Sequence, residues 1–488
     1  MAANNYRTLA LAFGAVLALG GCGNGADRVA SPGEGAFPPA PPPTTPPPTT
    51  PPPTTPPPPT GGPAADCPSG FTDVGTVANN TLRACRLPQL ITGNVVVPKR
   101  DGTVYAISGR VSVGQDQGGD AANPHPVPRG VLTIEPGVTL YASSGNDYLL
   151  VNRGSELYAD GTVDQPIIFT ARQDLEGQTN ADTMGLWGGL ILAGRAPINA
   201  CPGGTTSGTP QCQSQVEGTN AFYGGNAPND SSGRIRYVQV KYSGFEISPN
   251  NELQGITAAG AGSGTVLEYF HIHNSSDDGI EIFGGTMNAR YLVVTGADDD
   301  SIDTDTGWNG AIQFGIVIQR PGGGDRMNEW SSINRQPYSQ PRVANITYVG
   351  RAGGGAAIHL NQGTQASFYN SVVTRPAGGS GSAERCLEIR DANTTGTFHS
   401  VHFSCPVAFE DARAQTAFEA GTNNVVGTSS LTGVFINGSQ ERAVPAYQGL
   451  AQVHPFFRQV DYIGGVRDAN DTWWRGWTCG LTADSPSC

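Results

Sequence analysis

A repeat of 22 residues in the centre of the chain is the feature that most constrains its fold. Residues 277–282, DDGIEI, recur 22 positions later as residues 299–304, DDSIDT. The apolar segment 270–272 likewise recurs as residues 292–294. Between the copies lie Gly, Asn and Asp, with no helical periodicity. Short alternating strands repeated every 22 residues or so are typical of the successive coils of a solenoid.

Looser copies of this pattern lie on both sides. Residues 131–140, VLTIEPGVTL, alternate apolar and polar side chains, and similar strands recur as far as residues 398–403. Since connections between parallel strands are nearly always right-handed, we expect a mainly β chain in which residues 131–405 form a right-handed parallel β-helix. A propeller needs blades of roughly 40 residues, so the period argues against it. An antiparallel sandwich is the remaining alternative.

The two ends of a solenoid need covers, because uncovered ends expose strand edges and apolar core. We expect residues 67–130 to form an N-terminal cap region and residues 406–488 to add C-terminal coils and a cap. The tryptophans Trp473, Trp474 and Trp477 are predicted to cover the open end.

Composition agrees with a β protein that has many turns. Charged residues make up 14 % of the chain and there are 67 glycines, whereas average domains have about 25 % charged residues and 7 % glycine. This profile disfavours coiled coils and helix bundles. The net charge of −13 repels polyphosphates, so we expect no nucleic-acid partner.

The first 66 residues are predicted to target and tether the protein. Residues 1–21 contain Arg7 and a 13-residue apolar run, which is too short to span a bilayer and is typical of a signal peptide. The run ends in Leu-Gly-Gly-Cys, which resembles a bacterial lipobox; the resemblance implies cleavage before Cys22 and lipidation of its thiol. Residues 22–66 are rich in Pro and Thr and are expected to form an extended tether.

The other eight cysteines fall into close neighbours along the chain, without the spacing of a zinc site. Export implies an oxidising compartment, which favours disulfides that pin loops of the helix. Eight cysteines permit 105 pairings, so nearest-neighbour pairing is a hypothesis from sequence proximity. The pairs it predicts are Cys67 with Cys85, Cys201 with Cys212, Cys386 with Cys405, and Cys479 with Cys488.

The segment 277–308, DDGIEIFGGTMNARYLVVTGADDDSIDTDTGW, and the C-terminal sequences DYIGG at 461–465 and WWRGWT at 473–478 resemble a group of β-helical outer-membrane lipoproteins of Gram-negative bacteria. The resemblance covers residues 131–488. It implies a parallel β-helix and a location at the outer membrane, facing the periplasm or the cell surface. It implies no activity.

The acidic centre is the candidate functional site. Adjacent coils lie about 4.8 Å apart, so the 22-residue register places Asp278 over Asp300 and Glu281 over Asp303. Stacked carboxylates repel each other unless a cation, a raised pKa or donors compensate. Calcium accepts six to eight oxygen ligands, and its predicted ligands here are Asp278, Asp299, Asp300 and Asp303, with Asp277, Asp298 and Asp305 on neighbouring turns.

Two other interpretations of these acids remain open. Aspartates at solenoid turns bond their own backbone and can be purely structural. Alternatively, Asp278, Asp300 and Asp303 could catalyse polysaccharide cleavage, with Lys241 or His273 as a base and an arginine, Arg290, Arg320 or Arg326, countering the acids. For ligand binding we expect Glu281, Asp303 and Trp308, the last as a platform on which a sugar stacks.

Taken together, these features predict an outer-membrane-anchored module for binding or adhesion. Long, repetitive solenoid faces suit extended ligands such as polysaccharide, and an outer-membrane transporter is a possible partner. A calcium-assisted polysaccharide lyase or glycoside hydrolase centred on the acidic coils is one alternative. A structural role in the envelope is the other.

Overall fold

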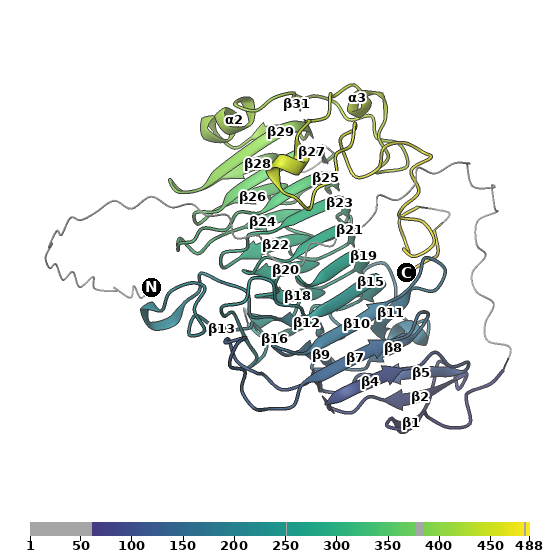
Figure 1. Ribbon diagram of the computed structural model, residues 1–488. Helices are drawn as coiled ribbons and strands as arrows, with labels where there is room; N and C mark the ends of the chain where they lie inside the picture. The colour runs from purple at the N-terminus through teal and green to yellow at the C-terminus, as the bar shows by residue number, and fades with distance from the viewer. Residues whose placement is uncertain (1–60, 250, 377–383, 483–484) are drawn as a thin grey trace, which may run out of the picture. The chain divides into compact units, whose positions relative to one another are not determined.

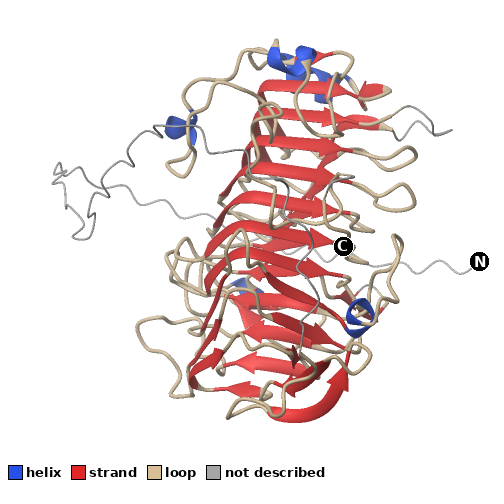
Figure 2. Cartoon of the chain, turned by 90° about the vertical axis from the view of Figure 1, so that its right-hand side faces the viewer, coloured by secondary structure: helices blue, strands red, loops and turns tan. Residues whose placement is uncertain are grey.

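The computed structural model describes residues 61–249, 251–376, 384–482 and 485–488. Two parallel β-sheets, here called sheet A and sheet B, share these residues, and their strands stack as a ladder from purple to green in Figure 1. The same ladder is seen from the side in Figure 2, with helices near its C-terminal end. The predicted signal peptide, Cys22 and most of the tether lie outside the described residues.

Sheet A contains β1 (Thr72–Val77), β2 (Leu82–Arg86), β4 (Gly93–Val97), β5 (Thr103–Ala106), β7 (Gly130–Ile134), β8 (Thr139–Ala142), β10 (Glu156–Asp160), β11 (Ile167–Ala171), β15 (Gly233–Lys241), β19 (Val266–His273), β21 (Asn288–Thr295), β23 (Ala311–Ile318), β25 (Arg342–Val349), β27 (Gln365–Thr374), β29 (Thr395–Ser404) and β31 (Val425–Val426). Sheet B contains β3 (Leu90–Ile91), β6 (Arg110–Val113), β9 (Tyr148–Val151), β12 (Gly189–Ala193), β18 (Ile256–Ala259), β20 (Ile280–Phe283), β22 (Ile302–Asp305), β24 (Asn328–Trp330), β26 (Ile358–Leu360), β28 (Arg385–Ile389) and β30 (Val407–Phe409).

The short elements lie outside these sheets: β13 (Ser214–Gln215) with β14 (Phe222–Tyr223), β16 (Glu246–Ser248) with β17 (Asn251–Glu252), the helices α1 (Arg172–Leu175), α2 (Ala412–Glu419), α3 (Ser439–Arg442) and α4 (Leu450–Val453), and a 3₁₀ turn, η1 (Pro202–Gly204). No helix among the described residues is both long enough and apolar enough to cross a membrane.

The neighbouring strands of both sheets run parallel, except that β1 pairs antiparallel with β2 at the N-terminal edge. The chain is therefore a parallel β-helix, as the sequence predicts. Its coils begin upstream of residue 131, since β2 already pairs with β5 and β4 with β7. The region expected to be only an N-terminal cap thus contains coils of the helix.

Each central strand of sheet A bends at one residue. The separate strands β10 and β11 pair with the two halves of β15, and the join falls at Tyr237, whose φ is 48°. The same left-handed conformation recurs on the following strands at Tyr269, Tyr291, Phe314, Asn345, Asn370 and Ser400. Such a conformation is unfavourable for most side chains. Stacking of the aromatic rings, with centroids 4.2 Å apart for Tyr269 and Tyr291, offsets part of that cost.

The interior is filled by columns of side chains. Ile280, Ile302 and Ile358 lie in one column on β20, β22 and β26 of sheet B and are fully buried, with the buried Asn328 of β24 between the last two. Alternate residues of the same strands point outward, because side chains alternate across a strand. The repeat therefore divides each short strand of sheet B between an apolar core and an outer face.

The cover of the C-terminal end is helix α2, not the tryptophans. Phe418 of α2 stacks on Phe403, with ring centroids 4.3 Å apart, and also contacts Phe398. The prediction that Trp473, Trp474 and Trp477 cover this end is wrong. These residues pack on the outer side of sheet A, against Val293 and Ile316.

The C-terminal segment runs back along sheet A, as the yellow trace in Figure 1 shows. Outward amides of sheet A hold it: Gln239 Nε2 donates to the Trp477 carbonyl at 2.7 Å and Asn345 Nδ2 donates to the Tyr462 carbonyl at 2.8 Å. Lys241 Nζ donates to the carbonyl of Cys488 at 2.8 Å. The outer face of sheet A is thus contacted by the C-terminal segment between β15 and β25.

Among the described residues, four disulfides are present: Cys67–Cys85, Cys201–Cys212, Cys386–Cys405 and Cys479–Cys488. They are the nearest-neighbour pairs that the sequence predicts. Cys201–Cys212 lies in the insertion between β12 and β15. Val216 and Tyr223 of this insertion, together with Leu253 from the segment between β15 and β18, pack on Leu150 and Ile191 and cover part of sheet B. This cover extends as far as Phe283 on β20, and the acidic residues lie at its edge on β20 and β22.

Candidate functional site

A column of outward side chains crosses the open part of sheet B. Strand pairing aligns Thr257 with Glu281, Glu281 with Asp303 and Asp303 with Glu329. The column continues with His359 and Glu388 on β26 and β28. The stacking of Glu281 over Asp303 is the register that the sequence predicts.

The turns before β20 and β22 add a second set of carboxylates. Asp278 Oδ1 accepts a hydrogen bond from the backbone N–H of Asp300 at 3.0 Å, and Asp300 Oδ1 accepts one from the N–H of Arg326 at 2.7 Å. Each of these aspartates therefore ties its own turn to the next coil. This contact explains the recurrence of the DD pair every 22 residues and gives both aspartates a structural role.

The outward column of sheet B and the turns before β20 and β22 together line a cavity of about 200 Å³, which we call the acidic pocket. Its lining residues are nine acids and one amide: Glu217, Glu252, Gln254, Asp277, Asp278, Glu281, Asp299, Asp300, Asp303 and Glu329. No Lys, Arg or His is among the described residues that line it. Like charges brought so close repel strongly, so the pocket requires compensation from outside this set.

Two carboxylates in the pocket have oxygens without a hydrogen-bond partner among the described residues. Glu281 is only 6 % exposed, and within the described ranges its side chain has no hydrogen bond or ion pair. Asp303 Oδ1 is buried without a hydrogen-bond partner. A buried carboxylate that is unpaired costs several kcal/mol unless it is protonated or bound to a cation. Carboxylate oxygens of Asp278, Glu281 and Asp303 lie within 4.8 Å of one another.

Protonation is the compensation available without a cation. Burial raises the pKa of Asp278 and Glu281 well above the ordinary carboxyl values, and the neighbouring carboxylates raise both further. Asp300 and Asp303 are shifted in the same direction for the same reasons. Burial and the charge of neighbouring acids raise the pKa of Asp277 to about 8. The metal-free pocket therefore keeps protons at neutral pH.

Further along the same column, guanidinium groups neutralise the acids. Arg326 forms ion pairs with Glu329 and with Asp325, the latter at 2.6 Å, and Arg326 Nε donates to His359 Nδ1 at 3.1 Å. Arg390 pairs with Glu388 and Glu410. The charge of the column is thus compensated on β24 to β30 but not on β20 and β22.

The donors of the acidic pocket fit a hard divalent cation. All its anionic ligand atoms are carboxylate oxygens, which calcium prefers, whereas zinc and copper favour nitrogen and sulfur. Three groups of acids are close enough to share an ion: Asp277 with Asp278 and Asp299, Asp278 with Glu281 and Asp303, and Asp299 with Asp300 and Asp325. The four predicted calcium ligands are distributed among these groups.

Trp308 is not a platform for a ligand. Its side chain is completely buried in the core of the helix, and its Nε1 donates to the Met287 carbonyl at 3.1 Å. The prediction that it stacks on a sugar is therefore wrong. The residue follows the acidic run in sequence, but the chain turns inward after β22.

Lys241 does not line the acidic pocket. Its Nζ pairs with Asp174 at 2.7 Å and donates to the carbonyl of Cys488, so the ammonium group is engaged beneath the C-terminal segment. His273 Nδ1 lies 2.8 Å from Thr295 Oγ1, and burial, with the nearby Lys241, lowers the pKa of this histidine to about 3. Neither of the predicted bases lines the pocket.

The three predicted arginines lie in different parts of the structure. Arg326 pairs with acids beside the pocket, as described above. Arg320 pairs with Asp298 and Asp182. Arg290 lies on sheet A, where it approaches Glu268 and donates to the Phe456 carbonyl.

Four residues that line the acidic pocket are not predicted from the repeat. Glu329 could have been found by extending the register from Asp303 across a longer turn. Glu217, Glu252 and Gln254 come from the insertions that cover β12 and β18. No repeat or motif marks them, since their position depends on how the insertions fold back over sheet B.

Stacked parallel coils with carboxylates gathered on one open face place this chain among the parallel β-helix proteins. A family model described as a pectate-lyase-like β-helix domain matches residues 126–478, so the chain belongs to that family. A comparison with curated proteins finds no match. Membership of the family fits a function related to polysaccharide.

Proposed function

We propose that the protein is an outer-membrane-anchored polysaccharide-binding protein whose acidic pocket holds calcium. One observation carries the proposal: Glu281 is buried in a pocket lined by nine acids and has no partner in the described part of the chain. A cation that binds there reduces the repulsion among the carboxylates and provides a metal centre that can accept further oxygen ligands.

Calcium would also link the pocket to a ligand. The ion takes six to eight oxygen ligands, so hydroxyl or carboxylate oxygens of a polysaccharide can complete the coordination that the acidic pocket begins. The family to which residues 126–478 belong supports this class of ligand. Without the ion, the acids repel any anionic chain.

The anchor is part of the proposal. Lipidation of Cys22 would attach the chain to the outer membrane, and the Pro/Thr-rich residues 22–66 would hold the β-helix away from the lipid surface. An outer-membrane transporter that receives the bound polysaccharide is the partner we propose. Replacement of Cys22 by Ala should move the protein from the membrane fraction to the soluble fraction.

The family membership also favours a second candidate, a calcium-assisted polysaccharide lyase. A lyase needs a base near the cation. Arg326 is the nearest cationic side chain described above, and Glu329, Asp325 and His359 already engage it. Appearance of the ultraviolet absorbance of unsaturated sugar products during incubation with calcium and polysaccharide would favour the lyase over the binding protein.

The test of the binding proposal combines calcium and polysaccharide titrations of the full-length protein. Calcium at a hundredfold excess over its Kd should raise the free energy of unfolding by about 2.7 kcal/mol, and polysaccharides should bind only in its presence. The double variant E281Q/D303N should lose both responses. The variant E388Q is the matched control, because Glu388 lies in the same column but pairs with Arg390.

Two results would contradict the proposal. Equal calcium stabilisation of E281Q/D303N and the native protein would place the ion elsewhere. Absence of any calcium response, with the variants folded and unchanged, would leave the aspartates as turn formers and favour a structural role in the envelope.

A further inference from the structure

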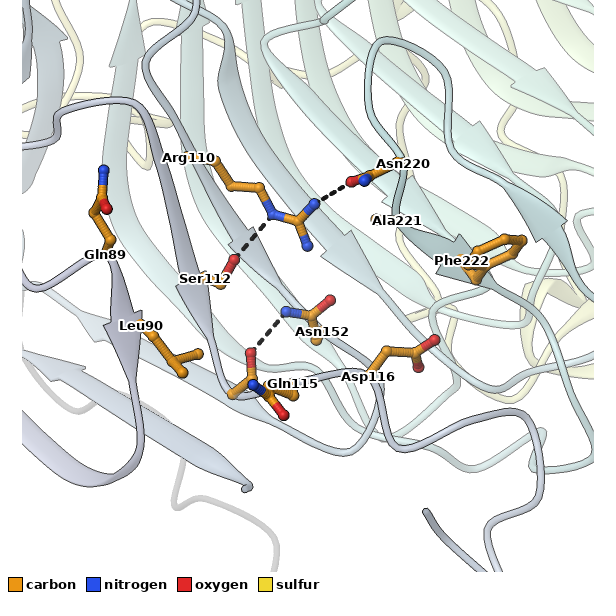
Figure 3. A pocket seen from close by; sticks show the side chains of 11 residues that line it. Gln89, Leu90, Arg110, Ser112, Gln115, Asp116, Asn152, Asn220, Ala221 and Phe222 are labelled. Atoms are coloured by element: carbon orange, nitrogen blue, oxygen red, sulfur yellow. Dashed lines mark hydrogen bonds between the residues drawn. The ribbon is translucent and has the colours of Figure 1, made fainter. Parts of the chain in front are cut away.

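A second cavity lies on the N-terminal coils of sheet B, and Figure 3 shows it from close by. Its volume is about 360 Å³, within the range of roughly 300 to 1,000 Å³ typical of ligand sites. We call it the arginine pocket. Strands β3 and β6, residue Asn152 after β9, and the hairpin of β13 and β14 line it.

Arg110 is the cationic group of this cavity. Its Nε donates to Ser112 Oγ at 2.9 Å and its Nη1 donates to Asn220 Oδ1, so two neutral groups fix the orientation of the guanidinium (Figure 3). No ion pair involves Arg110 in the described part of the chain, and its Nη2 has no hydrogen-bond partner there. A planar guanidinium held in this way is suited to a carboxylate.

The acid in the lining does not neutralise Arg110. Asp116 receives two hydrogen bonds from Arg153, at 2.6 and 2.5 Å, and forms its ion pair with that residue. The other polar side chains around the cavity are neutral: Gln89, Ser112, Gln115, Asn152 and Asn220. The lining thus holds one cation and one acid, and because Arg153 already pairs with that acid, Arg110 is the charged group of the lining without an ionic partner.

The remaining groups suit a sugar ring. Asn152 is 3 % exposed and donates to the Gly114 carbonyl at 2.8 Å, while its amide oxygen has no partner in the described ranges. Phe222 is 43 % exposed, and Leu90 is exposed as well. An exposed aromatic ring beside amides and one charged group offers apolar contact for the face of a sugar and hydrogen bonds for its hydroxyl groups.

One hairpin connects this cavity with the acidic pocket. Glu217, in the turn between β13 and β14, lines the acidic pocket, whereas Asn220 and Phe222 line the arginine pocket. Contacts on both sides hold the turn: the Gly218 N–H donates to Asn251 Oδ1 at 2.9 Å, and Thr219 Oγ1 lies 2.8 Å from the Tyr148 hydroxyl. The two cavities are therefore neighbours along sheet B.

We propose that the arginine pocket binds a carboxylate-bearing sugar residue, with Arg110 engaging the carboxylate and Phe222 contacting the ring. The inference rests on the proposed polysaccharide-binding function and specifies its ligand as an acidic polysaccharide. The two cavities then bind the carboxylates of that ligand in different ways. The acidic pocket binds them through calcium, and the arginine pocket binds them directly.

The test compares sugars that differ only in the carboxylate. Tetramers of glucuronate and of galacturonate, and their neutral glucose and galactose counterparts, are titrated by calorimetry into the full-length protein with saturating calcium. At least one uronate tetramer should bind ten or more times tighter than its neutral counterpart. R110Q should remove about tenfold of that preference, R110K should retain part of it, and F222A should weaken both sugars of the pair.

Controls separate this site from the acidic pocket. R86Q alters an exposed arginine away from the cavity and should bind like the native protein. R110Q should keep the calcium-dependent rise in melting temperature, which shows that it folds and that the acidic pocket is intact. A loss of calcium response in E281Q/D303N with uronate preference retained would support the arginine pocket and count against the proposed calcium bridge.

Three outcomes would overturn the inference. These are equal binding of uronate and neutral tetramers, unchanged preference in R110Q, and absence of binding by every tetramer. In the first two, polysaccharide binding through the acidic pocket would stand. In the third, the proposed function would fail together with the inference unless longer polysaccharides still bind.

Discussion

In the outward column of sheet B, Glu329 and Glu388 lie beside guanidinium groups, whereas Glu281 and Asp303 do not. Strands β20, β22 and β24 are adjacent, and β28 lies two strands further along the same parallel sheet. The fold therefore allows an arginine to lie beside an acid of this column. Arg326 and Arg390 neutralise the acids that have only a structural role. Where the chain supplies no arginine, the missing positive charge has to come from protons or from a bound cation.

The largest effect should follow from removing Arg326. The variant R326Q leaves Glu329 and Asp325 without their shared partner and removes the donor to His359. Breaking a buried ion pair costs about 3 to 5 kcal/mol; Arg326 is partly exposed, so we expect a loss of about 2 kcal/mol. Urea denaturation measures this loss. An unchanged midpoint would mean that the two halves of the column do not differ in compensation.

The pH dependence of stability should come next in size. The pKa of Asp277 is about 8 in the folded protein and about 3.9 when unfolded. Between these values the folded state holds a proton that the unfolded state has lost, so stability falls as the pH rises through this window and is fully retained below about pH 4. The slope is at most about 1.4 kcal/mol per pH unit for one group.

Thermal unfolding in EDTA from pH 6 to pH 7 measures this decline, and we expect a loss of about 1.3 kcal/mol over the range. Calcium should flatten the profile, because the ion replaces the protons. A stability that rises with pH in EDTA would contradict the raised pKa of the pocket.

Neutralising one acid should have opposite effects in the two halves. In EDTA, E281Q should stabilise the protein by about 1 kcal/mol, since the neutral amide removes the cost of protonating a buried carboxyl that has no partner. E329Q should destabilise it by a similar amount, because Arg326 then loses an acid. If chemical denaturation gave changes in the free energy of unfolding of the same sign for both variants, the two halves of the column would not differ in charge compensation.

The smallest effect is expected for Arg390. Its side chain is 52 % exposed, and exposed ion pairs contribute roughly 0 to 1 kcal/mol. R390Q should shift the free energy of unfolding by about 0.5 kcal/mol or less, and salt should reduce the shift. A loss as large as that of R326Q would show that the pair with Glu388 and Glu410 is more strongly coupled than its exposure indicates.

The parallel fold and the register of Glu281 over Asp303 could be predicted because a coil repeats itself in sequence as well as in space. The inward position of Trp308 could not, since aromatic side chains suit a core and a binding face equally well. Contacts between segments far apart in the sequence could not be predicted either. Neither the contribution of Glu217 to the acidic pocket nor the packing of Trp477 on sheet A is encoded in any local pattern.

The return of the C-terminal segment along sheet A has a consequence for folding kinetics. The hydrogen bond from Lys241 to Cys488 joins residues 247 apart, and that from Gln239 to Trp477 joins residues 238 apart. Coils of a solenoid can form one upon another through contacts with their neighbours, but contacts over such separations form slowly. Docking of this segment should therefore be the last step. The rings of Tyr237, Tyr269 and Tyr291, which Trp473 and Trp477 contact in the folded protein, should remain open to solvent until the whole chain has been synthesised.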